Sequence, residues 1–422
     1  MDELALHGGQ PVRTKPWVSK YLGSEEVGAE EKDRVLQVLN KKRIFRYLPA
    51  AIETSECSAL EEEYKAFLGT KYALGVNSGT SALICALVAA GVGPGDEVLL
   101  PAYTWVGSAA AITLVGAVPV LCEIDSSLTL DPNDMAKKVT AHTKAVLVVH
   151  MRGISADMDA IIAVAQERGI RVIEDVAQAN GGTYRGRMLG SIGDLGCFSL
   201  QQSKVITAGE GGMLVTQGEE LWQRAVLYHD GAGYQFRFTE RKIPAFPGQN
   251  YRLTELQAAL CLGQLGKLPA ILERTKANKQ QLVHALRQVS GIELSPVFGT
   301  ERDLGVSLIF YVKDGTSAHW VSRALTAEGI PAFHVYDPQE KDQHIYTNWE
   351  FLVGKRDPWG GSYPWSLHPA REMDYSQDSC PRSLGLLNRA VQIHLNHLAT
   401  EEDRKDILAA IRKVTAHLGS RR

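Results

Sequence analysis

Two residues in the middle of the chain have the types and positions that carbanion chemistry on an aldehyde cofactor requires. Asp175 lies near the end of the apolar run RVIEDV, and Lys204 follows the run GCFSLQ in a polar turn flanked by glycines. A carboxylate at the end of a parallel strand can keep a pyridine nitrogen protonated, and a lysine amine of lowered pKa can form a Schiff base. Taken alone, Asp175 is also a helix cap and Lys204 a surface lysine. Together they are predicted to be the catalytic pair.

Three further features are candidates for the same cofactor site, and the first two of them have the residue types of a phosphate site. The small and hydroxyl residues Asn77–Ser81 (NSGTS) lead from a strand into a helix, whose N-terminus offers unpaired N–H groups to an anion. Ser199 adds a hydroxyl close to the lysine, and Asn250 and Arg252 open a later helix. Each of the two helix starts is, taken alone, also typical of ordinary capping. Their combination with the catalytic pair indicates a phosphorylated cofactor.

The elements expected to position these residues alternate between strands and helices. Helical segments such as Met158–Arg168 interleave with short apolar runs at 97–102, 117–124, 144–151, 171–176, 196–201 and 211–216. Near-continuous apolar strands need cover on both faces, so the pattern predicts an α/β fold with a mostly parallel central sheet sandwiched by helices.

Flanking segments complete the predicted organisation. We expect helices at 30–40, 58–68 and 400–418, a loop-rich stretch at 217–250, a long helix over 254–289 kinked at Pro269, and a strand at 306–312. These predict an N-terminal arm and large cofactor-binding domain over residues 1–265. A smaller C-terminal α+β domain is predicted over residues 266–422.

Composition narrows the class of protein further. The 422 residues carry 45 Lys+Arg against 48 Asp+Glu, a formal net charge of −3, so nucleic acid is not an expected partner. The six cysteines are scattered in mostly apolar surroundings, without metal-ligand spacing, so we expect reduced core cysteines and no metal. No apolar stretch is long enough to span a bilayer. We therefore expect a cytoplasmic protein without membrane contact.

Five motifs in order resemble the DegT/StrS family of sugar aminotransferases. They are NSGTSAL, PAYTW, EDVAQA, FSLQQSK with AGEGG, and GQNYRLTELQAA. The resemblance covers most of the chain from about residue 25. It implies pyridoxal 5′-phosphate (PLP) as cofactor, the aspartate-aminotransferase fold (fold type I), and ping-pong transfer of an amino group from glutamate or glutamine through a Lys204 Schiff base. Other PLP chemistry on a sugar, such as dehydration, and a non-catalytic regulator are the alternatives. Dehydrating relatives carry histidine where this chain has Lys204.

The resemblance also assigns residues to roles around the cofactor. Asp175 looks like the partner of the pyridine nitrogen, and Gln178 resembles the side chain near the ring hydroxyl. Trp105 resembles the aromatic residue that stacks on the ring. Gly79, Thr80 and Ser199 look like the phosphate cradle. Asn250 resembles the residue that reaches the phosphate of the neighbouring subunit, which implies a homodimer with shared active sites.

The acceptor is the least determined part of the prediction. The stretch LHGGQPVRTKPW resembles relatives that aminate cyclitol ketones, whereas IFRYLPA, HMRG and TNWEFL resemble those that form amino-octulosonate sugars. Nucleotide-linked keto sugars stay open as a third class. Candidate substrate residues are Tyr47, His150, Arg152, His229 and Arg252. Within HMRG, Arg152 stands where an aromatic or small residue is expected, which indicates either a contact with a substrate carboxylate or a loop variant.

Overall fold

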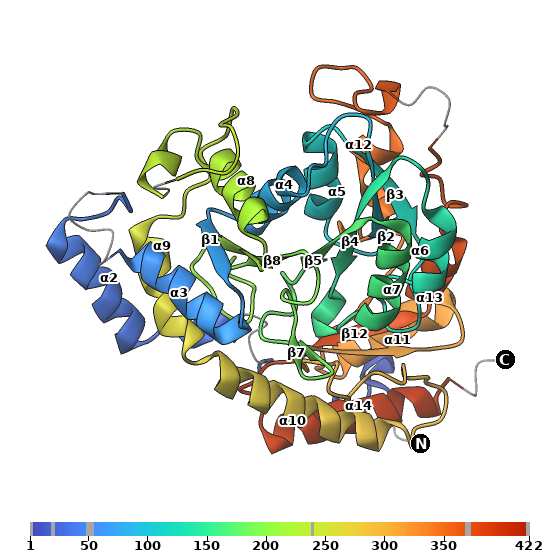
Figure 1. The fold of residues 1–422 in the computed structure, drawn as a ribbon. Helices are drawn as coiled ribbons and strands as arrows, with labels where there is room; N and C mark the ends of the chain where they lie inside the picture. The colour runs from blue at the N-terminus through green and yellow to red at the C-terminus, as the bar shows by residue number, and fades with distance from the viewer. Residues whose placement is uncertain (1–2, 18–21, 48–54, 238–239, 368–372, 419–422) are drawn as a thin grey trace.

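A seven-stranded sheet forms the centre of the computed structural model, which describes residues 3–17, 22–47, 55–237, 240–367 and 373–418 (Figure 1). The spatial order is β1-β9-β8-β5-β4-β2-β3. Only β9 pairs with its neighbours in the antiparallel sense, so the predicted mostly parallel sheet is confirmed. The strands are β1 (Tyr72–Val76), β2 (Glu97–Pro101), β3 (Val118–Cys122), β4 (Thr143–Val149), β5 (Arg171–Asp175), β8 (Leu195–Ser199) and β9 (Gly212–Thr216).

Helices cover this sheet because its strands are apolar along nearly their whole length. Every residue of β2, β3, β8 and β9 is buried. Figure 1 shows α4 (Gly79–Ala89), α5 (Val106–Leu114) and α8 (Glu219–His229) gathered above the sheet. Below or beside it lie α2 (Ala29–Lys41), α3 (Glu56–Leu68), α6 (Pro132–Lys138), α7 (Met158–Arg168) and α9 (Glu255–Leu265). The starts of α4 and α5 therefore meet the carboxyl ends of the parallel strands, where Asp175 lies.

A second, three-stranded antiparallel sheet lies in the C-terminal part of the chain. Its order is β10 (Ser307–Tyr311), β12 (Ala390–His394), β11 (Ala332–His334). It is accompanied by α10 (Leu268–Leu286), α11 (Gly315–Ala327) and α14 (Glu401–Ala416), with α10 and α14 side by side in Figure 1. Short elements complete the fold: α1 (Leu22–Glu25), α12 (Glu350–Val353), α13 (Pro381–Asn388), β6 (Thr183–Tyr184) and β7 (Arg187–Met188).

The N-terminal arm packs on this C-terminal part. The Arg13 guanidinium lies 2.7 Å from Asp403 and 2.9 Å from Asp406 on α14. Backbone N–H groups of the arm also donate to the buried carboxylate of Glu328. The arm thus connects the first residues of the chain to its last helix. The domain boundary between residues 265 and 266 stays a prediction.

Two expectations about the middle of the chain need correction. The predicted loop-rich stretch 217–250 is largely irregular after residue 229, but its first part forms α8, which begins after Gly218 with two glutamates in its first turn. The expected single helix over 254–289 is two helices, α9 and α10, separated at Gly266 and Lys267. Pro269 does not kink a helix: it lies in the first turn of α10, where its missing N–H leaves no bond unmade.

The cysteines and the hydropathy of the helices agree with the composition. All six cysteines are free and buried, as predicted for core residues. Among the described residues, no helix is long and apolar enough to cross a membrane.

Candidate active site

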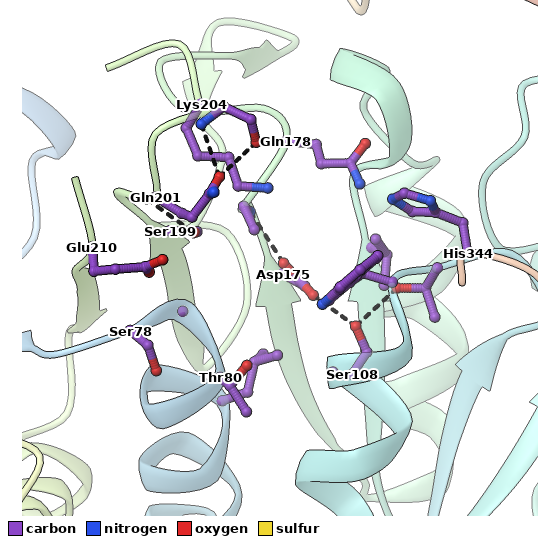
Figure 2. Close-up of a pocket in the computed structure, with 18 residues that line it drawn as sticks. Ser78, Thr80, Ser108, Asp175, Gln178, Ser199, Gln201, Lys204, Glu210 and His344 are labelled. Carbon is purple, nitrogen blue, oxygen red and sulfur yellow. Dashed lines mark hydrogen bonds between the residues drawn. The ribbon is translucent and has the colours of Figure 1, made fainter. Parts of the chain in front are cut away.

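A cavity of about 440 Å³ opens where β5 and β8 end and α4 and α5 begin. Figure 2 shows Ser78 and Thr80 at the start of one helix, Ser108 on a second helix, Asp175 between them, and Lys204 above. Ser78 and Lys204 face the same cavity although they lie more than 100 residues apart in the sequence. The parallel strand order brings them together, as the sequence predicts.

Asp175 is a buried carboxylate held in a fixed orientation. Its Oδ2 accepts a hydrogen bond from the Ser108 hydroxyl at 3.0 Å, and its Oδ1 accepts one from the Ala177 N–H at 3.1 Å. Burial raises the pKa of Asp175, while these two hydrogen bonds and the charge of Lys204 oppose the rise. A carboxylate in this environment is stabilised by a cationic partner, and a protonated ring nitrogen is one.

Lys204 lies in the loop between β8 and β9, across the cavity from Asp175. The loop is closed by backbone bonds from Ala208 N–H to the Leu200 carbonyl at 2.8 Å and from Gln202 N–H to the Gly209 carbonyl at 2.9 Å. Burial lowers the pKa of Lys204; Asp175 opposes this shift, and Arg152 adds to it. The lowered pKa leaves more free amine than an exposed lysine would have, which a nucleophilic or proton-carrying lysine needs.

The start of α4 forms a cradle of small residues. Ser78 caps the helix, its Oγ accepting from the Ser81 N–H at 3.0 Å. A Cβ on Gly79 would lie 2.8 Å from Cβ of Ser199, and a Cβ on Gly212 would lie 2.3 Å from the Ser78 carbonyl oxygen. Glycine is therefore required at both positions for the helix start to approach β8 and β9 this closely. The cradle places Thr80 and Ser199 at the edge of the same cavity.

Trp105 and Gln178 line the cavity, as the sequence predicts. Trp105 immediately precedes α5, and its side chain stays half-exposed because it faces the open space. Gln178 Oε1 accepts a hydrogen bond from the Arg152 N–H at 3.0 Å. The bond fixes the side chain amide beside Lys204.

Another group of polar residues lies at the mouth of the cavity and was not predicted from the sequence. His344 lines the cavity, with its ring centre 5.1 Å from that of Trp105. Its Nδ1 lies 2.6 Å from Oδ1 of Asp342. Burial and Arg152 lower the pKa of His344 to about 4, against the opposing effect of Asp342, so the ring is neutral at pH 7. Ser108, Gln201, Ser203 and Glu210 are likewise cavity residues that the sequence analysis did not select.

Arg152 joins this polar group at the mouth. Its Nε donates to the Tyr103 hydroxyl at 3.1 Å, and its Nη2 lies 3.6 Å from Asp342. Arg152 adopts a positive φ of 53°, which turns the side chain out of the strand that precedes it. Together with Lys204 it lines an adjoining hollow of about 370 Å³. The side chain is therefore oriented toward the space next to the catalytic lysine.

Comparison with known proteins identifies the architecture of this site. Residues 26–355 match the DegT/DnrJ/EryC1/StrS aminotransferase family. The chain belongs to this family. It is 36% identical to L-glutamine:2-deoxy-scyllo-inosose aminotransferase of Streptoalloteichus tenebrarius, over 99% of both chains. It is 34% identical to the enzyme of the same name from Streptomyces lividus, over 99% of this chain and 98% of the other. The solved aminotransferase from Psychrobacter cryohalolentis is 27% identical, with a TM-score of 0.77 over 96% of this chain and 100% of the other.

The DegT/StrS chain is thus a transaminase of the PLP fold type I, and pyridoxal 5′-phosphate is its cofactor. The cavity fits that group on three grounds. Asp175 is a buried carboxylate without a cation in contact, the cradle at Gly79 is one that a Cβ would fill, and Lys204 faces the same space with a lowered pKa. Ring nitrogen, phosphate and aldehyde each have a chemically suited neighbour.

Other candidate residues of this aminotransferase lie outside the cavity. His150 is fully buried: Ala156 N–H donates to its Nδ1 at 3.1 Å, so Nε2 carries the proton that Glu174 accepts at 3.1 Å. Arg252 Nη1 pairs with Asp230 at 2.7 Å. The structure does not bring either side chain to the cavity lining.

Tyr47 and His229 belong to a separate buried polar cluster. Its centre is Glu61, which lies 2.9 Å from Arg46 Nη2 and 3.0 Å from Arg237 Nη2. Burial and the neighbouring Arg237 lower the pKa of His229 to about 3. Among the described residues, none offers a hydrogen-bond partner to the buried Tyr47 hydroxyl or to His229 Nε2. Residues 48–50 of the IFRYLPA motif lie outside the described residues.

Asn250 is exposed and does not line the cavity of its own chain. Its backbone pairs with Asp230 in an isolated bridge. A residue that serves the partner's phosphate is expected to lie on the surface of its own subunit, so its assignment across a dimer stays a prediction.

Proposed function

We propose that this aminotransferase moves the α-amino group of L-glutamine to the ketone of a neutral cyclitol of the scyllo-inosose type, in ping-pong fashion. Glutamate is the alternative donor. The observation that carries the acceptor class is the match to 2-deoxy-scyllo-inosose aminotransferases along the full length of both chains. The charge of the cavity lining independently supports it.

That lining is poor in cations. In the part of the chain that the structure describes, the only lysine or arginine side chains lining the cavity and the adjoining hollow are Lys204 and Arg152. We assign Arg152 to the carboxylate of the amino-acid donor, because guanidinium binds carboxylate well. A keto-octulosonate or nucleotide keto sugar brings additional negative charge, which would need further cations, and these would have to come from the partner subunit. A neutral polyhydroxy ketone needs only hydrogen bonds, which His344, Gln178 and Gln201 offer.

We assign the chemistry to the predicted catalytic pair. When bound, the cofactor supplies an electron sink for the carbanion formed at Cα of the donor. Lys204 Nζ, whose pKa burial lowers, takes a proton from Cα of the donor and returns one to the carbon of the acceptor. Asp175 Oδ2, oriented by Ser108, holds the proton on the ring nitrogen. Both half-reactions use one lysine in one cavity, which requires the keto acid to leave before the ketone enters.

The remaining residues hold and enclose the cofactor. The N–H groups at the start of α4, with the hydroxyls of Thr80 and Ser199, hold the phosphate. Trp105 covers the ring and excludes water, and Gln178 orients the ring hydroxyl. We propose a homodimer in which Asn250 completes the phosphate site of the partner subunit. The buried free cysteines suit a reducing compartment, so we place the enzyme in the cytoplasm.

Isotope transfer tests donor and acceptor together. The purified enzyme is incubated with L-glutamine labelled with ¹⁵N at either the α-amino or the amide position. The acceptors compared are 2-deoxy-scyllo-inosose, scyllo-inosose, a keto-octulosonate and a nucleotide keto sugar. We expect the α-label, and not the amide label, in an amino-cyclitol, with kcat/KM at least tenfold above the anionic acceptors. A preference for an anionic acceptor would refute the acceptor class, and absence of label in every amine product would refute the transfer itself.

A further inference from the structure

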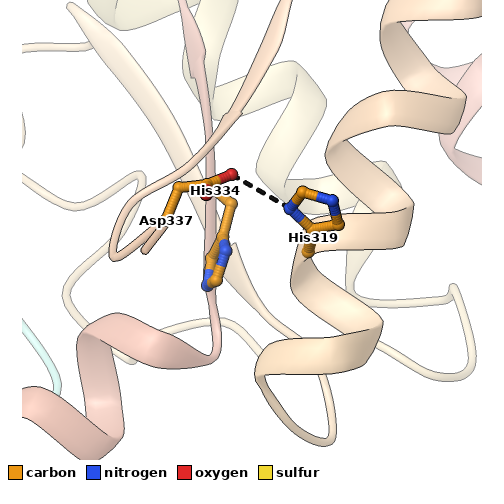
Figure 3. Close-up of side chains that lie close together, drawn as sticks. All are labelled: His319, His334 and Asp337. Atoms are coloured by element: carbon orange, nitrogen blue, oxygen red, sulfur yellow. Dashed lines mark hydrogen bonds and ion pairs between the residues drawn. The ribbon is translucent and has the colours of Figure 1, made fainter. Parts of the chain in front are cut away.

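A cluster of two histidines and one aspartate lies outside the catalytic cavity, where α11 packs against β11. His319 is on α11, His334 ends β11, and Asp337 lies in the turn that follows (Figure 3). One ring nitrogen from each histidine and one carboxylate oxygen of Asp337 all lie within 4.8 Å of one another. No metal site was predicted from the sequence, where the cysteines are scattered and no Cys/His cluster has metal-ligand spacing; these three residues meet only in the folded chain.

His334 has the hydrogen-bond arrangement of a histidine that binds metal. Its Nε2 lies 2.8 Å from the carbonyl oxygen of Asn388, and because a carbonyl can only accept, Nε2 carries the proton. Nδ1 therefore holds a bare lone pair. This nitrogen is buried, in a residue that is only 7% exposed, and no residue in the described part of the chain forms a hydrogen bond with it. A metal-bound histidine commonly donates its second N–H to a backbone carbonyl, so Nδ1 is free to bind a cation.

Asp337 and His319 offer the other two ligand atoms in a suitable geometry. Asp337 Oδ1 accepts from the Gln339 N–H at 2.8 Å, which orients the carboxylate and leaves Oδ2 toward His319. Oδ2 lies 3.0 Å from His319 Nδ1. Two ligand atoms bound to Zn²⁺ in a tetrahedron are about 3.3 Å apart, so this pair is already near that separation. The His319 side chain is 34% exposed, which gives an ion a path from solvent.

We propose that His319, His334 and Asp337 form a binding site for a divalent first-row metal, with Zn²⁺ as the ion that suits two imidazoles and one carboxylate. Water fills the fourth position, because the cluster is open to solvent on the His319 side. The site joins α11 to the chain just before Asp342 and His344. His334 lines a hollow of about 310 Å³ that these two residues also line. A bound ion would therefore fix the base of the segment that reaches the catalytic cavity.

Calorimetry on the untagged, cofactor-loaded enzyme tests the site. The protein is first freed of metal with a chelator, the chelator is removed, and ZnCl₂ is titrated. We expect one equivalent of Zn²⁺ to bind, and binding to weaken tenfold or more in each of His319→Ala and Asp337→Asn. Cobalt(II) gives a second readout: a visible band of tetrahedral cobalt in the wild type, lost in both variants.

Two control variants separate this site from others that could take zinc. His284→Ala removes an exposed histidine of α10, and Asp342→Asn breaks the histidine–aspartate pair at the cavity mouth. Both should keep the wild-type zinc affinity and stoichiometry. The proposal is overturned if no one-to-one saturable binding occurs, or if His319→Ala and Asp337→Asn bind as the wild type does. Loss of the site in Asp342→Asn alone would equally refute it. Melting temperature and cofactor absorbance verify that each variant is folded.

Discussion

Replacing His150 by alanine should lower stability and leave acceptor binding almost unchanged. The sequence analysis selected His150 as a substrate residue, but both of its ring nitrogens are engaged inside the protein. Nε2–H donates to Glu174 Oε2, whose side chain is fully buried and also accepts from the Gly190 N–H at 2.8 Å. No part of the imidazole is left to meet a ligand.

The magnitude follows from the two bonds that alanine cannot make. A hydrogen bond to a buried charged group contributes about 1.5–3 kcal/mol, and leaving the Ala156 N–H without a partner costs about 1–3 kcal/mol. The free energy of unfolding should thus fall by roughly 3–5 kcal/mol. For a chain of this length the melting temperature should fall by about 3–6 °C. Differential scanning calorimetry measures the melting temperature, and steady-state kinetics at 20 °C measures KM for the acceptor, which should change by less than about threefold.

Two control experiments test whether the loss of stability in His150→Ala comes from these hydrogen bonds. His284→Ala, on the exposed face of α10, should melt with the wild type. In a Glu174→Gln background the His150→Ala change should lower stability much less, because the charged acceptor is already gone. A variant that melts like the wild type while its KM for the acceptor rises tenfold would refute the structural role and restore His150 to the substrate site.

Four further substitutions test other parts of the structure. Gly79→Ala places a Cβ 2.8 Å from Cβ of Ser199, so we expect PLP affinity measured by equilibrium dialysis to fall about tenfold or more, with little change in fold. Burial alone would raise the pKa of Glu61, but the partly buried Arg237 and the buried Arg46 lower it to about 2. Ionised Glu61 therefore stabilises the folded state above its ordinary pKa, and this stabilisation is lost as the pH falls from about 4.5 toward 2. Glu61→Gln should destabilise by about 3–5 kcal/mol at pH 7, and urea titrations should show the difference narrowing over that acid range. Lys204→Ala should abolish turnover and the visible absorbance of the lysine-bound cofactor. If Asn250 serves the partner subunit, mixing inactive Lys204→Ala with Asn250→Ala should restore up to about a quarter of wild-type activity, and no recovery after subunit exchange would contradict the shared site.

The cofactor residues could be predicted because local sequence determines where they lie. Asp175 ends a buried strand, Gly79 begins a helix, and Lys204 follows another strand. Parallel topology then brings strand ends and helix starts to one edge of the sheet. Each of these three positions is defined by an element boundary that the hydrophobic pattern already reveals.

Side chains that depend on tertiary direction could not be assigned in the same way. His150 and Arg152 both follow β4 and are two residues apart, yet one is fully buried and the other reaches the mouth of the cavity. The two side chains take different directions because Arg152 has a positive φ, which no sequence pattern predicts for an arginine. His229 ends the helix α8 and does not line the cavity of its own chain, a position that the polar sequence after it did not reveal.

His344 shows why acceptor recognition can change while the cofactor site stays intact. The segment that carries it is attached through its backbone to the strand end and helix start beside Trp105. Thr104 N–H donates to the His344 carbonyl and Val106 N–H to the Gln343 carbonyl, each at 2.9 Å. These bonds do not involve the side chains of residues 342–344. A substitution of His344 can therefore change the chemistry of the cavity lining while these backbone bonds stay in place, so relatives with the same catalytic pair need not share a substrate. The sequence motifs of the cofactor site consequently identify the reaction but not the acceptor.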